Sequence, residues 1–398
     1  MNSSCRPASI HQAPAPLRNL IAQMKPQLIS AVARLGIGQP DVIPLWLGES
    51  DRITPSFIQR AAAEAMAAGK TFYVQSRGVP ELRTAIRLYT NELYNLDLDI
   101  ERFTVTGSAM TAIMIALECV MDAGDNVVMP TPIWPNIFFA VEVLGGQCRF
   151  VRLDRDARGW RLDLDHLFDA CDERTRALIL PSPGNPTGWV MSSEQQAAVL
   201  SFCRERGIWI IADEVYHRIV FDGTRVAAPS FLNIAAADDP LFVINSFSKS
   251  WAMTGWRLGW ITAPAALGDT LGQLSSLNNT GATSFVQHAG VAALREGSGF
   301  VQEMVDYCRT GRNIAYQRLS AFSRVTLPPI AAGLFAFFSV DGMGDSLAFA
   351  QDLLRSYRVG LAPGSAFGPG NDQCLRLCFA VQPDRLTEAL DRLAAALA

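Results

Sequence analysis

The chain has 398 residues, of which 49% are hydrophobic and 18% are charged, a composition typical of a globular rather than a disordered protein. Its net charge of −4 provides no general attraction to nucleic acid or to acidic membranes. No apolar run reaches the roughly 18 residues that a membrane span needs, and residues 1–20 lack the apolar core of a secretory signal. Eight cysteines without a C-x-x-C pair and four scattered histidines predict a cytoplasmic protein with reduced thiols and no metal site.

The first part of the chain alternates between strand and helix patterns. Residues 105–120 indicate a strand that leads through Gly107 and Ser108 into an apolar helix. Three later apolar runs are typical of buried strands: 176–183, 207–214 and 241–248. A helical pattern with a serine cap lies between the first two, at 192–207. This alternation predicts an α/β fold with a mostly parallel, doubly wound sheet, on which ligands bind beyond the carboxyl ends of the strands.

The pattern changes beyond about residue 285. A long helical pattern at 301–322 precedes short strands at 334–341 and 374–381 and a last helix at 384–397. We therefore expect a second, smaller α+β domain. The predicted division has three parts: an N-terminal segment that packs with the small domain (1–45), a large domain (46–285) and a small C-terminal domain (286–398).

Nucleotide-binding motifs are not supported. The stretch EAMAAGKT (64–71) ends like a phosphate-binding loop, but Glu64 stands where the first glycine is required. The stretch also continues a helical pattern, and no G-x-G-x-x-G follows a strand. An enzyme that uses ATP or a dinucleotide is therefore disfavoured.

Three ionisable residues lie in or directly after apolar runs. Lys249 sits between two serines in SFSKS (246–250), Asp213 follows the run IWIIA, and Arg376 interrupts CLRLCFA (374–380). Burial and nearby positive charge would allow the lysine amine to be neutral and nucleophilic. A buried carboxylate needs a partner, and a guanidinium binds a carboxylate through two parallel hydrogen bonds. For each residue alone, a solvated lysine, a helix-capping aspartate or an internal ion pair stays open.

Four motifs in one order carry a family resemblance. They are SPGNPTG (182–188), ADEVY (212–216), SFSKS (246–250) and RLCFA (376–380). With LGESDRITP (47–55), they resemble the fold-type-I pyridoxal-phosphate enzymes, specifically class I/II aminotransferases, over nearly the whole chain. The resemblance implies a seven-stranded sheet in the large domain, a smaller α+β domain, and pyridoxal 5'-phosphate held by Lys249 as an aldimine.

The resemblance also implies roles for other cofactor-binding residues. Asp213 pairs with the pyridinium nitrogen, Tyr216 and Asn185 bind the phenolic oxygen, and Trp134 stacks on the ring where many relatives have tyrosine. The phosphate is bound after the strand that ends at Gly107, by the following residues: Ser108, Ala109, Ser246, Ser248 and Arg257. Tyr73 reaches the phosphate of the neighbouring subunit, which implies a homodimer with shared active sites.

For the substrate, the resemblance implies that Arg376 binds the carboxylate of an amino acid, assisted by Asn185 and Gly48. The reaction implied is a ping-pong transamination between an L-amino acid and a 2-oxo acid, with Lys249 as covalent anchor and general acid/base. A C–S β-lyase on the same fold is the alternative, because it shares Lys249, Asp213 and Arg376. A cofactor-binding regulator is disfavoured because no DNA-binding module is visible.

The preferred side chain of the substrate is only weakly indicated. Some relatives that prefer acidic substrates carry a lysine where this chain has Ala109. Trp46, Ile133 and Trp134 suggest a pocket that tolerates apolar or aromatic side chains, with Trp46 in contact with the substrate.

Overall fold

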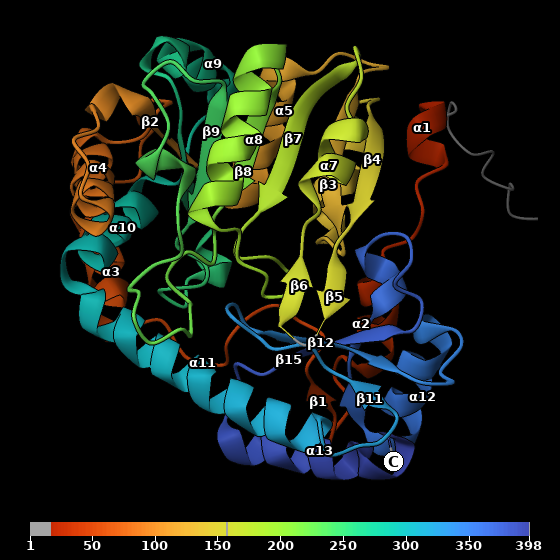
Figure 1. The fold of residues 1–398 in the computed structure, drawn as a ribbon. Coiled ribbons are helices and arrows are strands. Elements are labelled where there is room, and N and C mark those ends of the chain that lie inside the picture. Colours follow the sequence, from red (N-terminus) through yellow and green to blue (C-terminus); the bar gives the residue numbers. More distant parts are fainter. Residues whose placement is uncertain (1–16, 157, 398) are drawn as a thin grey trace, which may run out of the picture.

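A seven-stranded sheet forms the centre of the computed structural model, which describes residues 17–156 and 158–397 (Figure 1). In spatial order the strands are β2 (Phe103–Thr106), β10 (Gly259–Thr262), β9 (Leu241–Ser246), β8 (Trp209–Asp213), β7 (Thr175–Pro181), β3 (Asn126–Thr131) and β4 (Gln147–Arg152). Only β10 runs antiparallel to its neighbours, and the pairs from β9 to β4 are parallel. The predicted α/β fold with a mostly parallel sheet is confirmed.

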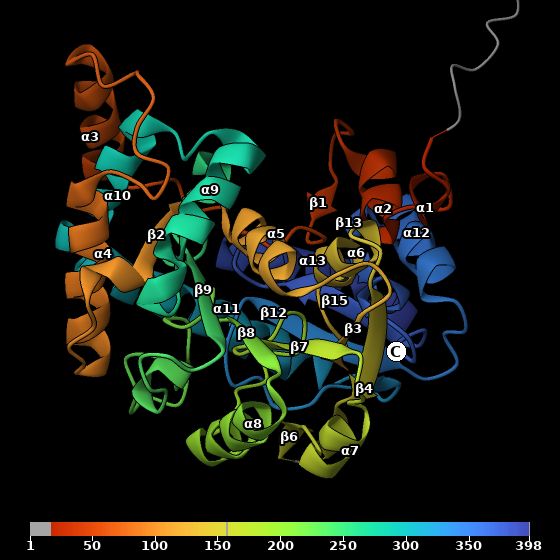
Figure 2. The same cartoon turned by 90° about the horizontal axis from the view of Figure 1, so that it is seen from above.

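Helices cover both faces of this sheet (Figure 2). One face carries α5 (Ala109–Val120), α6 (Pro135–Val143) and α9 (Gly268–Asn279), and the other carries α7 (Leu164–Asp169) and α8 (Ser193–Arg206). Along β8, Ile211 packs in the first core, whereas Ile210 and Ala212 pack in the second. This alternation is the period of two that places successive side chains on opposite faces of a strand.

A second, antiparallel sheet lies below the first in Figure 1. Its order is β11 (Val325–Thr326), β12 (Phe335–Val340), β15 (Cys374–Cys378) and β14 (Ala362–Pro363). Its helices are α11 (Ser298–Leu319), α12 (Ser346–Tyr357) and α13 (Pro383–Leu397), and α2 (Leu28–Gly36) packs against α12. The short strand β1 (Ile43–Pro44) pairs in parallel with β13 (Val359–Gly360), so N-terminal and C-terminal segments share one layer.

The other elements lie at the edges of the two sheets. Helices α3 (Ser56–Ala67), α4 (Pro80–Tyr94) and α10 (Ser284–Glu296) pack together beside β2. The helix α1 (Asn19–Ala22) lies near α6, and β5 (Asp154–Asp156) and β6 (Gly159–Arg161) form a hairpin. Because Glu64 lies within α3, the stretch EAMAAGKT is not a loop between a strand and a helix. Among the described residues, no helix is both long and apolar enough to cross a membrane.

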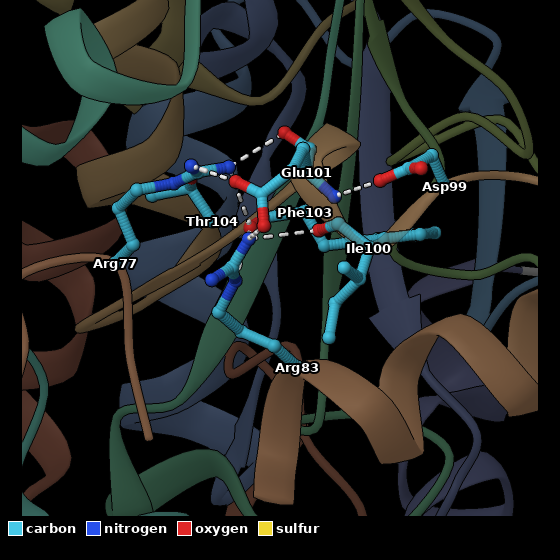
Figure 3. Close-up of polar contacts among 7 residues, drawn as sticks. All are labelled: Arg77, Arg83, Asp99, Ile100, Glu101, Phe103 and Thr104. Atoms are coloured by element: carbon cyan, nitrogen blue, oxygen red, sulfur yellow. Dashed lines mark hydrogen bonds and ion pairs between the residues drawn. The ribbon is translucent and has the colours of Figure 1, made fainter. Parts of the chain in front are cut away.

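Two arginines fasten the edge strand β2 to helix α4 (Figure 3). Arg83 of α4 donates hydrogen bonds to the carbonyls of Phe103 (3.0 Å) and Ile100 (2.9 Å). Arg77 donates to the Glu101 carbonyl at 2.6 Å, and both guanidinium groups pair with the Glu101 carboxylate, at 2.6 and 3.2 Å. The contact also fixes the end of the exposed segment 71–76, which leads directly into Arg77.

Candidate active site

A cavity of about 280 Å³ lies where the carboxyl ends of the large-sheet strands meet the small sheet. Its floor is formed by residues at or just after the ends of β7, β8 and β9, and its opposite wall by Arg376 of β15 and by residues 46–48. Carboxyl ends of parallel strands are the usual place for ligands on a doubly wound sheet. The three ionisable residues singled out by the sequence therefore meet in one cavity.

Asp213 is the last residue of β8 and is only 6% exposed. Its Oδ1 accepts a hydrogen bond from the Val215 amide at 3.3 Å, and it has no ion-pair partner within 4 Å among the described residues. Burial raises the pKa of the carboxyl to about 6, against the lowering effects of the Val215 amide and of Lys249. Such a carboxylate is suited to accept a hydrogen bond from a protonated ring nitrogen.

Lys249 follows β9 and reaches across the cavity to the opposite wall. Its Nζ donates a hydrogen bond to the Gly48 carbonyl at 2.6 Å and lies 5.9 Å from the centre of the Tyr216 ring. Burial lowers the pKa of the amine to about 8, and Arg376 and Arg257 lower it further, whereas Cys378 and Glu49 act in the opposite direction. This lowered pKa makes the neutral amine, which acts as a nucleophile and base, more accessible than that of an ordinary lysine.

Arg376 is buried, with 2% of its surface exposed, and its guanidinium lies 4.4 Å from the Phe335 ring centre and 4.9 Å from that of Phe367. One terminal nitrogen donates to Asn185 Oδ1 at 3.1 Å and the other to the Trp46 carbonyl. Its Nε has no hydrogen-bond partner among the described residues. Burial lowers the pKa to about 10, so the group is still a cation at neutral pH. A buried cation without a carboxylate partner is suited to bind one from a ligand.

The start of α5 provides a place for an anion. The Ser108 side chain accepts from the Thr111 amide, which leaves the earlier amides of the first turn, including that of Ala109, for a ligand. Gly259 of β10 passes so close that a Cβ there would lie 2.9 Å from the Ala109 nitrogen. The exposed Arg257 guanidinium lies on the same cavity, adding positive charge.

Residues 35–393 match the model of the family aminotransferase class I and II. The chain belongs to this family. A probable aspartate/prephenate aminotransferase of Aquifex aeolicus is 32% identical over 97% of each chain. A probable N-acetyl-LL-diaminopimelate aminotransferase of Bacillus subtilis is 31% identical over 89% of this chain and 88% of its own. The solved aromatic aminotransferase of Pyrococcus horikoshii OT3 superimposes with a TM-score of 0.85, at 30% identity over 93% of this chain and 98% of that one.

The chain is thus an aminotransferase with the fold of type I, as the motifs predicted. Members of this family generally depend on pyridoxal phosphate. The relatives are named as aminotransferases and not as lyases, so the β-lyase alternative is not favoured. Their names differ in the substrate, which leaves the specificity of this aminotransferase open.

The cavity of the aminotransferase brings together most of the residues that the sequence singled out. They are Trp46, Gly48, Ala109, Trp134, Asn185, Asp213, Tyr216, Ser246, Ser248, Lys249, Arg257 and Arg376. Gly107 and Ser108 directly precede Ala109 but do not line the cavity. Tyr73 lies elsewhere: it is 90% exposed and borders a separate hollow with residues 279–285.

One residue of the predicted pocket is not among the residues that line it, and Trp46 meets Arg376 through its backbone. The Trp46 ring packs toward Gly36 and Gly360, where an added Cβ would lie 2.6 and 1.8 Å from it, and its carbonyl accepts a hydrogen bond from Arg376. Contact between Trp46 and the substrate stays a prediction. Ile133 is fully buried in the core beside α5 and α6 and is not among the residues that line the cavity.

Sequence reasoning also missed several cavity residues. The apolar side chains among them include Ile29, Leu47, Met110, Ile113, Ile137 and Val215. Met110 and Ile113 lie three residues apart at the start of α5, a helical spacing that could have pointed to a shared face. Ile29 comes from the distant helix α2, and no local pattern identifies it as a cavity residue.

Proposed function

We propose that this aminotransferase uses pyridoxal 5'-phosphate bound in the cavity between the two sheets, with Lys249 as its covalent anchor. The observation that carries the proposal is the convergence of Asp213, Lys249 and Arg376 on one cavity. A buried carboxylate, an amine of lowered pKa and a buried guanidinium are the three groups that a pyridinium ring, an aldehyde and an amino-acid carboxylate require.

The residues present fit this cofactor. Asp213 is a buried carboxylate without a cationic partner in the described structure, which a pyridinium N–H would supply. The Ser246 and Ser248 hydroxyls lie 2.8 Å apart on the cavity, near the start of α5 and Arg257, and together they would hold the phosphate. Trp134 at the start of α6 and Asn185 and Tyr216 line the same space and would contact the ring and its phenolic oxygen.

When bound, the cofactor supplies an aldehyde for covalent attachment and an electron-withdrawing ring. The protein's own groups then bind the substrate and move the proton. Arg376, positioned by Asn185 and flanked by two phenylalanine rings, would hold the substrate carboxylate. The Lys249 amine, on the same cavity, would take the proton from the substrate α-carbon and return it to the cofactor.

Two further features belong to this proposal. Tyr73 and its neighbour Phe72 are 90% and 81% exposed, as expected of residues that contact a second subunit, so we infer a homodimer in which Tyr73 reaches the partner's phosphate. We also infer a division into a large and a small domain. The pairing of β1 with β13 supports an N-terminal segment that packs with the small domain. The contact of α10 with α3 and α4 favours a second boundary near Gly297 rather than at residue 285.

The test is a two-stage absorbance experiment on the holoenzyme. We expect an amino acid to remove the visible absorbance of the bound cofactor and a 2-oxo acid to restore it. Lys249→Ala should still bind the cofactor non-covalently but should lose turnover by at least about 10³-fold. The control is Lys70→Ala, which removes an exposed lysine outside the cavity. Irreversible release of pyruvate and ammonia would instead establish elimination, and residual turnover in Lys249→Ala would refute the role of this lysine.

A further inference from the structure

We propose that the cavity selects amino acids with an apolar side chain, of the leucine, methionine or phenylalanine type, and rejects aspartate and glutamate. The inference rests on the proposed function, because it assigns Arg376 to the carboxylate that all amino acids share. The inference concerns the side-chain space, which is the part of the cavity that the cofactor and the substrate carboxylate do not occupy.

In the proposed function, each charged side chain on the cavity is assigned to a group that every substrate or the cofactor carries. Four charged residues line it: Asp213, Lys249, Arg257 and Arg376. Of the three cations, Lys249 is held by the Gly48 carbonyl and Arg376 by Asn185 and the Trp46 carbonyl. Arg257 donates to the Thr254 carbonyl at 2.6 Å and lines the same cavity as Ser246 and Ser248, with which we assign it to the phosphate. Within the described part of the chain, no further lysine, arginine or histidine lines the cavity to meet a second carboxylate.

Beyond the charged residues and the residues that we assign to the cofactor, the lining is apolar and comes from separate parts of the chain. Ile29 of α2 and Leu47 stand on the side of the small sheet, and Met110, Ile113 and Ile137 come from α5 and α6. A carboxylate placed among these side chains would lose its hydration without a compensating partner. An aliphatic or aromatic side chain would instead gain from leaving water.

A second subunit that contributes the hollow around Tyr73 brings no cation from the residues that line it. These residues, 71–74 and 279–285, contain neither lysine nor arginine. A second copy of the chain that contributes these segments would therefore not change the charge of the side-chain space.

Binding of unreactive acids tests the inference without turnover. Succinate and 4-methylpentanoate match aspartate and leucine without the amino group, and both keep a carboxylate for Arg376. Calorimetry on the holoenzyme should give a dissociation constant at least about 10-fold lower for 4-methylpentanoate. Equal or tighter binding of succinate would overturn the inference.

Turnover should follow the same order. We expect kcat/KM for the best of leucine, methionine and phenylalanine to exceed that for aspartate and glutamate by on the order of 100-fold. Preference for aspartate would overturn the inference while leaving the proposed function intact. If no amino acid changed the cofactor absorbance, the proposed function would fail, and the calorimetric ratio would still decide the nature of the side-chain space.

A variant that places a positive charge on the apolar wall, compared with a matched surface variant, tests the inference further. Ile29→Lys puts an ammonium group on the cavity, whereas Ile37→Lys makes the same change at a residue that is 71% exposed, directly after the same helix. Ile29→Lys should shift the ratio of succinate to 4-methylpentanoate affinity toward succinate by about 10-fold. A shift no larger than that of Ile37→Lys would remove Ile29 from the side-chain wall and contradict the inference.

Discussion

Asp213, Lys249 and Arg376 are three ionisable side chains that are held away from water with an incomplete set of partners. Burial shifts each pKa toward the neutral form, to about 6 for the carboxyl, about 8 for the amine and about 10 for the guanidinium. In each case a ligand group of opposite charge or a covalent bond would complete the environment. The free energy that such burial costs the unliganded protein is therefore returned when cofactor and substrate bind.

The Asp213 carboxyl predicts a pH dependence of cofactor binding. Above about pH 6 the group is charged and can accept the ring N–H, and below it the group is protonated. Affinity for pyridoxal phosphate should therefore be highest above pH 6 and should fall by up to about tenfold per pH unit below it. Fluorescence titration of the cofactor-free enzyme between pH 5 and 8 measures this.

The matched variant for this prediction is Asp213→Asn. It should bind the cofactor on the order of 100-fold more weakly at pH 8. The cofactor's own phosphate also titrates in this range. The informative quantity is therefore the ratio of the cofactor affinity of the unmodified enzyme to that of Asp213→Asn at each pH. That ratio should shrink as the pH falls through 6, and a constant ratio would exclude Asp213 as the titrating group.

At the scale of elements, the large sheet and its helices could be predicted from the sequence because their signals are local. The buried strand β8 and the helix α8, capped by Ser192, lie where the apolar run and the capping serine predicted them. Asp213 and Lys249 lie at the carboxyl ends of two predicted parallel strands. Because these ends meet at one edge of a sheet, both residues could be placed there before the structure was known.

The parts that could not be predicted depend on contacts between distant segments. The Trp46 ring packs toward Gly36 at the end of α2 and Gly360 of β13, and β13 lies beside Trp46 because it pairs with β1. Ile29 lines the cavity because α2 packs against the small sheet. Periodicity reports which face of an element is apolar, but it carries no information about which distant element covers that face.

The close approach of β10 to α5 predicts a role for Gly259. A Cβ at this position would lie 2.8 Å from the Asn245 carbonyl oxygen and 2.9 Å from the Ala109 nitrogen, both backbone atoms that cannot move independently. Gly259→Ala should therefore push β10 from the start of α5, lower stability by about 1–3 kcal/mol and weaken cofactor binding by about 10-fold. Gly255→Ala is the control, because a Cβ there has no atom within 4 Å. Equal cofactor affinity in both variants would show that the close approach does not shape the phosphate site.

The contacts that Arg83 and Glu101 make in Figure 3 predict unequal losses of stability when each residue is substituted. Arg83 is 8% exposed and donates to two backbone carbonyls, so Arg83→Met should cost about 1–3 kcal/mol of unfolding free energy. The Glu101 side chain is 52% exposed, so Glu101→Gln should cost less than about 1 kcal/mol. Urea unfolding of both variants measures the difference. An equal loss would mean that the ion pair, and not the carbonyl contacts, holds β2 to α4.

At the scale of the whole molecule, the site is built from segments that lie far apart in the chain. Residues 46–48 follow β1, and Arg376 lies in the small sheet. Asp213 ends strand β8 of the large sheet, and Lys249 follows strand β9. Lys249 itself bridges the two layers through the Gly48 carbonyl. Tyr73, by contrast, lies outside this cavity and borders a separate hollow, on an exposed segment that leads into Arg77. This arrangement predicts that Tyr73 acts on another copy of the chain.

Hybrid dimers of two variants, one with weakened cofactor binding and one without the anchor, test this prediction. In a homodimer of Tyr73→Ala, every site lacks the tyrosine and should bind the cofactor about 10-fold more weakly. In a homodimer of Lys249→Ala, every site lacks the anchor. If Tyr73 serves the partner, a hybrid of the two variants contains one site with both Lys249 and Tyr73. That site should bind the cofactor with the affinity of the unmodified enzyme and should restore about half of the turnover.

The outcome separates the two possible arrangements because they distribute the substitutions differently. If Tyr73 served its own subunit, the Lys249→Ala subunit would keep the tyrosine without the anchor, and the Tyr73→Ala subunit would keep the anchor without the tyrosine. No site of the hybrid would then be complete, and cofactor titration would give only the weakened affinity. Sedimentation of the unmodified chain supplies the remaining control, since a monomer with full activity at assay concentration would exclude a shared site altogether.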